Sequence, residues 1–254
     1  MSETNKPKKL TIDDILVRWM EWAHREYGHD GVQHGSAHAL MLWTEWSMFG
    51  DASQDPLLFC CKSYPDFALE LVESGIDVNV QTASGDTPLH FAVSRKNLAL
   101  VQALLARNVA IDAVNEYGFT PLREAVTIAA GDIVQELLNA GADPDFTPEE
   151  LHEPPVVLIW EEMVQRHNKT PYRYQSLIDT FVALVDGGAD LRALCSEERG
   201  DDLVQLLLAT KSLECFKIGT DVRRIRFEEE HLLRAMDEDQ PEIADYIASK
   251  LPTA

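Results

Sequence analysis

The sequence lacks any apolar run that approaches the roughly 20 residues of a membrane-spanning helix. Its first ten residues, MSETNKPKKL, contain no apolar core of the kind that a secretory signal carries. The lysines of this segment predict a short disordered tail over residues 1–9. We therefore expect a cytoplasmic protein that does not bind membranes.

Cysteine is scarce, with four residues at Cys60, Cys61, Cys195 and Cys215. None of them stands in a CxxC pair or in a zinc-binding spacing, and adjacent cysteines such as Cys60 and Cys61 rarely bridge each other. We expect buried, reduced thiols, which are typical of an intracellular protein.

Positive charge is also scarce, because 22 Lys and Arg stand against 43 Asp and Glu, which gives a net charge of −21. A chain this acidic repels DNA, RNA and anionic membranes. The charge therefore predicts no nucleic-acid partner and favours either a basic protein partner or a role in solubility. Acidic residues cluster at 197–198, 201–202, 228–230 and 237–239.

The motifs of common enzymes are absent: the chain contains no GxSxG, HExxH or P-loop sequence, and no GxGxxG follows a strand pattern. We expect no catalytic residue and no cofactor. One cluster leaves a metalloprotein open as an alternative, since a hairpin would bring together His24, His29, His34 and His38. Their spacing of five, five and four residues does not require a metal site, so we favour capping of helix ends.

What the sequence does contain is a repeat. The segment from Ser84 and the segment from Tyr117 align without a gap at an offset of 33 residues. The matching pairs are Gly85 with Gly118, Thr87-Pro88-Leu89 with Thr120-Pro121-Leu122, Ala92 with Ala125, Val101 with Val134, Leu104-Leu105 with Leu137-Leu138, and Asn108 with Gly141. So many matches at one offset indicate a structural repeat.

Each matched position has a physical role in a helix–turn–helix unit. Thr87 and Thr120 can N-cap a first helix, and the proline after each occupies the first helical position, where a missing N–H costs nothing. A second helix follows, with its apolar residues on one stripe. Asn108 and Gly141 tolerate the left-handed backbone that ends such a helix.

This pattern resembles the ankyrin repeat, in which TPLH starts a short helix, a longer helix follows and a GADVN-like sequence ends the unit. The resemblance is strong over residues 75–145, and an earlier unit begins near Asp55. It implies an all-α solenoid of stacked helix–turn–helix repeats with short β-turn fingers. His90 of TPLH would tie the backbone of a finger to the helix, and Arg123 replaces it in the next repeat.

The pattern loosens after these repeats. Gly188 closes a unit 47 residues after Gly141, which implies an insertion of about fourteen residues. We expect its two helices at 155–160 and 177–185, with a lengthened loop over 167–176. A shortened unit follows, and two helices from residue 231, split at Asp237–Gln240, are expected to form a terminal cap.

The amino-terminal end has no ankyrin signature. We expect a helix over Leu10–Tyr27 that Thr11 caps and a second helix from Ser36 through Met48, together forming a capping hairpin for the solenoid. Four tryptophans are expected in its core and rim, at Trp19, Trp22, Trp43 and Trp46. One continuous solenoid is then predicted, with a tail over 1–9, a cap over 10–54, regular repeats over 55–145 and divergent repeats with a carboxyl-terminal cap over 146–254.

The resemblance also implies a function, because ankyrin arrays bind other proteins through the finger tips and the concave face of the first helices. By position, the finger residues that would bind a partner are Gln81, Ser84, Asp86, Glu116, Tyr117 and Phe119. The corresponding residues of the first helices are Ser94, Arg95, Thr127, Ile128, Trp160 and Glu161. Tyr117 and Phe119 are the most informative, since two aromatics at one finger tip would either contact a partner or pack on an adjacent finger.

We therefore expect a non-catalytic protein-binding module that is a monomer when free. A more specific alternative is an acidic inhibitor or immunity-type protein that blocks a basic, nucleic-acid-processing enzyme. That alternative predicts binding that weakens steeply as the salt concentration rises.

Overall fold

The structure is a computed structural model of the 254-residue chain. It describes residues 55–148, 153–166, 171–194, 227–237 and 239–251, with scattered positions at 10–25 and 204–220. These residues fall into two compact units, Met1–Pro121 and Leu122–Ala254. Both units are helical, and no strand occurs over the described ranges.

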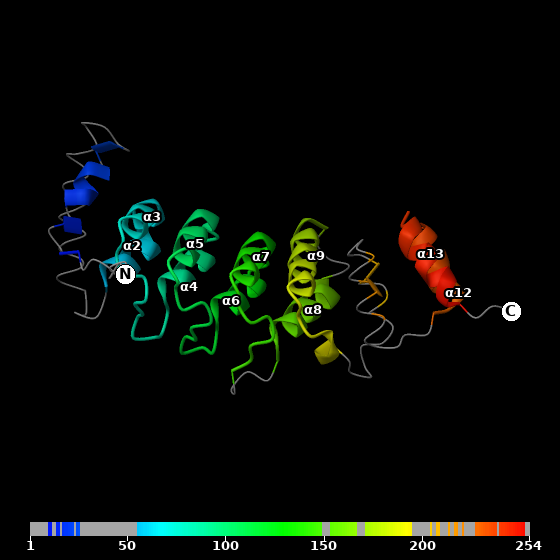
Figure 1. Ribbon diagram of the computed structural model, residues 1–254. Helices are drawn as coiled ribbons and strands as arrows, with labels where there is room; N and C mark the ends of the chain where they lie inside the picture. The colour runs from blue at the N-terminus through cyan, green and yellow to red at the C-terminus, as the bar shows by residue number, and fades with distance from the viewer. Residues whose placement is uncertain are drawn as a thin grey trace, which may run out of the picture. The chain divides into compact units, whose positions relative to one another are not determined.

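The first unit contains two complete helix pairs (Figure 1). They are α2 (Pro56–Ser63) with α3 (Pro65–Glu73), and α4 (Pro88–Ser94) with α5 (Leu98–Leu105). The first helices, α2 and α4, contact each other, as do the second helices, α3 and α5. Fully buried leucines fill the space between these two layers, at Leu57, Leu71, Leu89, Leu100 and Leu104. The expected helix–turn–helix stacking is therefore confirmed.

The ends of these helices are fixed as the sequence predicts. The Asp55 carboxylate accepts a hydrogen bond from the Leu57 N–H at 2.8 Å, and Thr87 caps α4 with proline next in the chain. Asn108 has a φ of 53° and Gly141 a φ of 97°, the left-handed backbone expected after each second helix.

The amino-terminal helix is described in part, since the described positions from 14 to 25 are helical. The Thr11 hydroxyl accepts the Asp14 N–H at 3.2 Å, which confirms Thr11 as its cap. Trp19 and Trp22 are both 5 % exposed, and Trp19 packs edge-on against Phe67 with ring centroids 4.9 Å apart. These two tryptophans are core residues as expected. The second helix of the hairpin, with Trp43 and Trp46, lies outside the described residues.

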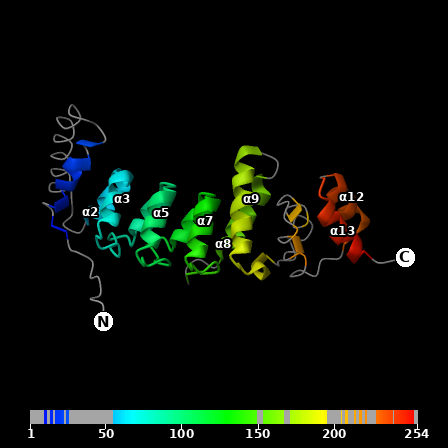
Figure 2. The same cartoon turned by 45° about the horizontal axis from the view of Figure 1, so that its top comes forward.

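The second unit contains the remaining helices of the described residues. They are α6 (Pro121–Thr127, whose first residue closes the first unit), α7 (Gly131–Asn139), α8 (Pro155–Arg166), α9 (Pro171–Asp186), the 3-10 turn η1 (Leu191–Leu194), α12 (Glu229–Asp237) and α13 (Pro241–Lys250). Helix α9 packs against both α7 and α8, and α12 packs against α13 (Figure 2). Gly131 permits a close approach, because a Cβ there would lie 3.1 Å from the backbone of Asp179 and Thr180.

Two expectations about the second unit are corrected and one is confirmed. Helix α8 continues to Arg166, well beyond the expected end. Helix α9 begins at Pro171, so residues 171–176 are helical and the expected loop over 167–176 is wrong for them. Proline supplies the reason, since its fixed φ suits the first position of a helix. The two helices expected at the carboxyl end are present, with their break at Asp237–Gln240.

None of the helices in the described part of the chain is long and apolar enough to cross a bilayer. Cys60 and Cys61 are free and buried, as expected, and burial raises the pKa of the Cys61 thiol to about 12. Cys195 and Cys215 lie outside the described residues. The domain boundaries expected from the sequence stay predictions.

Candidate protein-binding surface

The finger before α4 is a tight turn held by its own polar groups. The Thr82 N–H donates to the Asp86 carbonyl at 2.9 Å, and the Gly85 N–H donates to the Thr82 carbonyl at 3.0 Å. Gly85 has a φ of 80°, which a residue with a side chain rarely adopts. The Ser84 hydroxyl donates to the Asp86 carboxylate at 3.0 Å. Ser84 and Asp86 therefore shape this finger.

The next finger is organised by one side chain, that of Asn115. Its Oδ1 accepts hydrogen bonds from the Tyr117 N–H at 3.1 Å and the Phe119 N–H at 3.0 Å. The Asn115 N–H donates to the Phe119 carbonyl at 3.1 Å, and Gly118 turns the chain with a φ of 74°. Three hydrogen bonds of Asn115 thus hold the backbone of the tip that carries Tyr117.

The two fingers are also bonded to each other. The Asn115 Nδ2 donates to the Asp86 carboxylate at 2.8 Å, and the Glu116 N–H donates to the Ser84 carbonyl at 2.8 Å. Gly85 lies so close that a Cβ there would be 3.0 Å from the Asn115 Cα. These bonds join the two tips, residues 84–86 and 114–119, into one surface, which we call the finger surface.

His90 ties this surface to α4. Its Nδ1 accepts the Thr87 N–H at 3.2 Å, and its Nε2 lies 3.0 Å from the Phe119 carbonyl oxygen. A carbonyl oxygen only accepts, so Nε2 carries a proton, and Nδ1 carries none because it accepts the Thr87 N–H. With one ring proton the imidazole is neutral. Burial lowers the pKa of His90, although the bond to Phe119 partly offsets this effect. The structural role expected for His90 is confirmed.

The finger surface exposes one large aromatic side chain. Tyr117 is 66 % exposed and Val114 beside it is 39 % exposed. A hydrogen bond to Glu116 raises the pKa of the Tyr117 hydroxyl. Phe119 is half-buried and Gln81 is exposed at the edge of the preceding finger. Of the two aromatics expected at the tip, Tyr117 is the more accessible.

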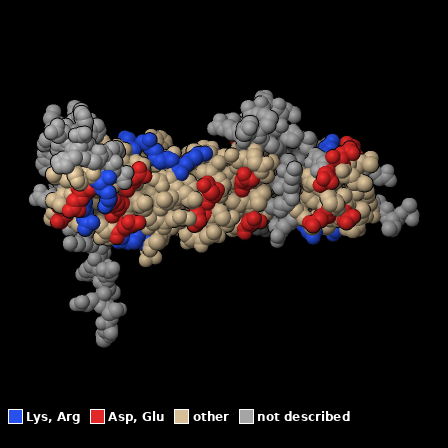
Figure 3. All heavy atoms as spheres, turned by 90° about the horizontal axis from the view of Figure 1, so that it is seen from above, with Lys and Arg blue, Asp and Glu red and all other residues tan. Residues whose placement is uncertain are grey.

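Ser94 and Arg95 lie at the other end of α4, roughly 10 Å along the helix from the finger. The Ser94 hydroxyl donates to the Phe91 carbonyl at 3.1 Å, and the Arg95 guanidinium donates to the Lys62 carbonyl at 2.7 Å. Arg95 thus ties the end of α4 to the end of α2. Lys and Arg side chains form a band on the face shown in Figure 3, and Lys62 is exposed at the same helix ends as Arg95.

The candidate residues of the second unit fare differently. Thr127 is exposed, with its hydroxyl donating to the Arg123 carbonyl at 2.9 Å, while Ile128 and Glu161 are half-buried. Trp160 is 1 % exposed and packs on Phe181 with ring centroids 5.9 Å apart. The expectation that Trp160 faces a partner is therefore wrong. Its ring fills the space between α8 and α9, where the two lengthened helices pack together.

Asn115 is not among the residues expected at this surface from the sequence. It stands 33 residues after Thr82, whose hydroxyl accepts the Asp86 N–H at 3.0 Å just as Asn115 accepts the Phe119 N–H. The repeat offset therefore contained the signal, because two polar acceptors occupy the same position of consecutive fingers.

No group of three metal-binding side chains occurs over the described positions. His24 is exposed on the amino-terminal helix. His29, His34 and His38 lie outside the described residues, so the histidine alternative stays a prediction.

Comparison with known proteins agrees with the helix pairs and the finger geometry. Residues 57–147 match the family model described as ankyrin repeats in three copies. The chain is 43 % identical over 82 residues to human neurogenic locus notch homolog protein 4, and 42 % identical over 81 residues to neurogenic locus notch homolog protein 1 of Danio rerio. These matches cover 32 % of this chain in each case, but only 4 % and 3 % of the relatives. Residues 57–147 of this chain are an array of ankyrin repeats.

Proposed function

We propose that this chain binds a partner protein through the finger surface, with Tyr117 as the anchor. The observation that carries the proposal is a contrast within one turn: the Tyr117 side chain is 66 % exposed, while hydrogen bonds hold the backbone around it. A side chain on a fixed backbone loses little conformational freedom on binding. Aromatic residues displayed in this way are common anchors of interfaces.

The charge of the surface favours a basic partner. Glu116 and Asp86 lie beside Tyr117, and the chain as a whole carries a net charge of −21. An Arg side chain of the partner could stack on the Tyr117 ring and pair with the Glu116 carboxylate. The buried thiols of Cys60 and Cys61 are consistent with action in the cytoplasm.

Site-specific photo-crosslinking tests this proposal. A benzophenone amino acid replaces Tyr117 in the full chain, which is expressed in its native host and irradiated. The matched control carries the same amino acid at Ala99, an exposed position of the second helix α5. We expect a discrete cross-linked protein from position 117 that is absent from position 99. Equal cross-linking from the two positions would contradict the proposal.

The charge also supports a second candidate function, that of an acidic inhibitor that occupies the nucleic-acid site of a basic enzyme. The inhibitor candidate is tested by measuring the affinity of this chain for the partner that cross-linking identifies, at increasing salt concentrations. Attraction between two oppositely charged surfaces weakens as ions screen it, so the dissociation constant should rise steeply. A dissociation constant that hardly changes between low and physiological salt would exclude the inhibitor candidate and leave the finger surface untouched.

A further inference from the structure

Helix α12 exposes two large apolar side chains on one face. Leu233 is 61 % exposed and Met236 is 62 % exposed, and their spacing of three residues places them side by side on the helix surface. The opposite face of α12 packs against α13, where Ala235 is fully buried. Leu233 and Met236 are therefore not needed for packing within the hairpin.

Helix α13 shows how different this exposure is. Its exposed positions are mostly polar or charged, and they include Glu242, Asp245 and Ser249. Of the two helices that form this hairpin, α13 therefore presents mainly polar and charged side chains, whereas α12 presents two large apolar ones.

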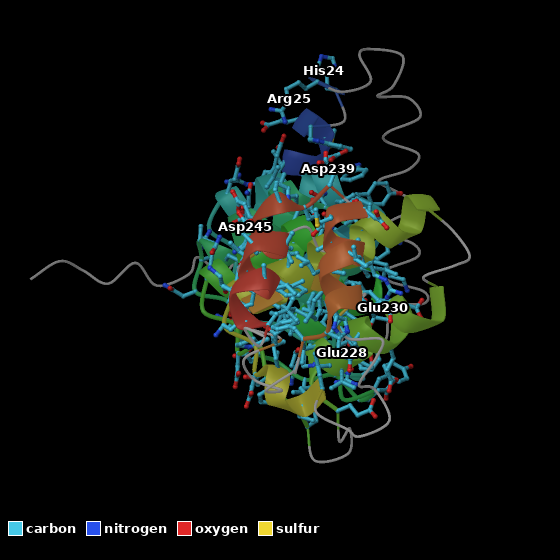
Figure 4. All side chains as sticks on the ribbon, turned by 90° about the vertical axis from the view of Figure 1, so that its right-hand side faces the viewer. His24, Arg25, Glu228, Glu230, Asp239 and Asp245 are labelled. Carbon is cyan, nitrogen blue, oxygen red and sulfur yellow. The ribbon has the colours of Figure 1, made fainter. Side chains whose placement is uncertain are left out.

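Acidic side chains surround the two apolar residues. Glu228, Glu230, Asp237 and Asp239 are all exposed, at the two ends of α12. Arg234 is the one Arg or Lys of α12, and its guanidinium lies 3.6 Å from the Glu230 carboxylate. Figure 4 looks onto α12 and α13 with Glu228 and Glu230 near one end of α12 and Asp239 at the other. Patches of acidic side chains, with a few Lys or Arg among them, are also visible at this end of the chain in Figure 3. We call Leu233, Met236 and these four acids the α12 face.

The charges decide which partner this face fits. A second copy fits poorly, because antiparallel pairing through Leu233 and Met236 would set Glu230 of one copy against Asp239 of the other. Parallel pairing would set each acid against itself, and the net charge of −21 adds repulsion between whole chains. A helix with an apolar stripe between Lys or Arg residues would instead bury Leu233 and Met236 while its cations meet the acidic rim.

We propose that the α12 face docks a basic amphipathic helix of a partner protein. Two exposed apolar side chains supply the contact area, and the acids at both ends of α12 select the charge of the partner. This site is separate from the finger surface and does not depend on it.

Fluorescence anisotropy with a defined probe tests the proposal on the full chain. The probe is a labelled peptide of about four helical turns, made of Leu and Lys, with leucines at i, i+3, i+4 and i+7. Because any cationic peptide is attracted to an acidic protein, the readout is the difference between variants. We expect the double variant Leu233→Ser/Met236→Ser to bind the probe about tenfold or more weakly than the unchanged chain.

Three controls separate the α12 face from general attraction. The double variant Val17→Ser/Met20→Ser, which truncates two exposed apolar residues at the same spacing on the amino-terminal helix, should bind the probe as the unchanged chain does. The charge variant Glu230→Lys/Asp237→Lys should weaken binding without removing an apolar contact. A peptide with Glu in place of Lys should not bind. Circular dichroism checks that each variant remains folded.

Equal probe binding by the Leu233→Ser/Met236→Ser variant and the unchanged chain would overturn the proposal. So would sedimentation showing a dimer that this variant abolishes, because a second copy would then occupy the face. Neither outcome depends on the photo-crosslinking result at Tyr117. Failure of the proposal for the α12 face can therefore be distinguished from failure of the proposal for the finger surface.

Discussion

The finger surface of the first unit and the lengthened α8–α9 pair of the second unit use aromatic side chains in opposite ways. Tyr117 is 66 % exposed on a turn whose polar groups already hold it in shape, whereas Trp160 is 1 % exposed between two helices of 12 and 16 residues. At Tyr117, hydrogen bonds fix the backbone, so the aromatic ring is not needed for packing and is available to a partner. Where lengthened helices pack on each other, the aromatic ring is needed to fill the space between them.

The same two regions differ in how a first helix is tied to the chain that follows. His90 reaches the Phe119 carbonyl through Nε2 at 3.0 Å, while Arg123, at the matching position of the next repeat, donates to the Glu153 carbonyl at 2.6 Å. The link across one repeat is therefore kept although its chemistry changes. Burial lowers the pKa of both side chains, from an ordinary value of about 6.5 for histidine and from a value far above neutral pH for arginine.

The largest effect that would test this comparison is the loss of Trp160. Replacing it with Ala should lower the free energy of unfolding by about 3–5 kcal/mol, because a cavity opens beside Phe181. Urea denaturation followed by circular dichroism measures the change. The matched Trp160→Phe variant keeps a ring in the space and should lose less. An unfolding free energy for Trp160→Ala within error of the unchanged protein would show that the ring does not fill a core.

The second test concerns His90, where truncation to Ala should cost about 1–3 kcal/mol of unfolding free energy, because the polar groups of Thr87 and Phe119 lose their partner. His90 should also make the stability depend on pH. Its pKa is lowered in the folded state, so the unfolded chain binds a proton more readily. Stability should therefore fall as the pH drops below about 6.5, the ordinary value of histidine, until the folded-state pKa is passed.

Urea midpoints at pH 7.5 and at pH 5.5 measure this dependence. The control is the variant His90→Gln, which keeps a side-chain donor and acceptor but does not titrate. We expect the unchanged protein to lose more stability than His90→Gln between the two pH values. An identical loss in both proteins would mean that His90 is not the group that responds.

The sequence predicts the regular repeats well because each of their boundaries rests on one local rule. Thr87 caps, proline starts the next turn of helix, and Asn108 takes the left-handed backbone, and all three are visible in the letters. Lys96 and Ala129 also have positive φ, at 54° and 51°, in the turns between two helices. Nothing in their residue types indicates this. Backbone hydrogen bonds close both turns, since the Asn97 N–H donates to the Ala92 carbonyl and the Ala130 N–H to the Ala125 carbonyl, each at 3.0 Å.

The candidate site is predicted less completely, because its contacts join residues that are distant in the sequence. Tyr117 is recognised from the aromatic character of its finger, but the bond between Asn115 and Asp86 joins groups 29 residues apart. The expectation that Trp160 faces a partner is wrong for a tertiary reason. Helix periodicity places the residue on one face of α8 but does not say which element covers that face. Local patterns indicate which side chains are displayed only where neighbouring repeats follow the same pattern.

The third test breaks the bond between the fingers. The single variants Asn115→Ala and Asp86→Ala and their combination form a double-mutant cycle, whose coupling energy should be about 1 kcal/mol. Asn115→Ala should have the larger single effect, because it also removes the acceptor of the Tyr117 and Phe119 N–H groups. Urea unfolding of the four proteins gives the cycle. Strictly additive effects would show that the bond between the Asn115 and Asp86 side chains contributes nothing to stability.

The smallest effect on stability is expected at Tyr117. Its side chain is 66 % exposed and its hydroxyl bonds to Glu116, so Tyr117→Ala should leave the urea midpoint unchanged within error. The same variant should cause the largest loss of partner binding, measured by titration calorimetry with the partner that cross-linking identifies. Tyr117→Phe keeps the ring and loses the hydroxyl, so it should retain most of the affinity if the ring is the anchor. A large loss of stability in Tyr117→Ala would place this ring in the same structural role as that of Trp160, and the difference between the two regions would disappear.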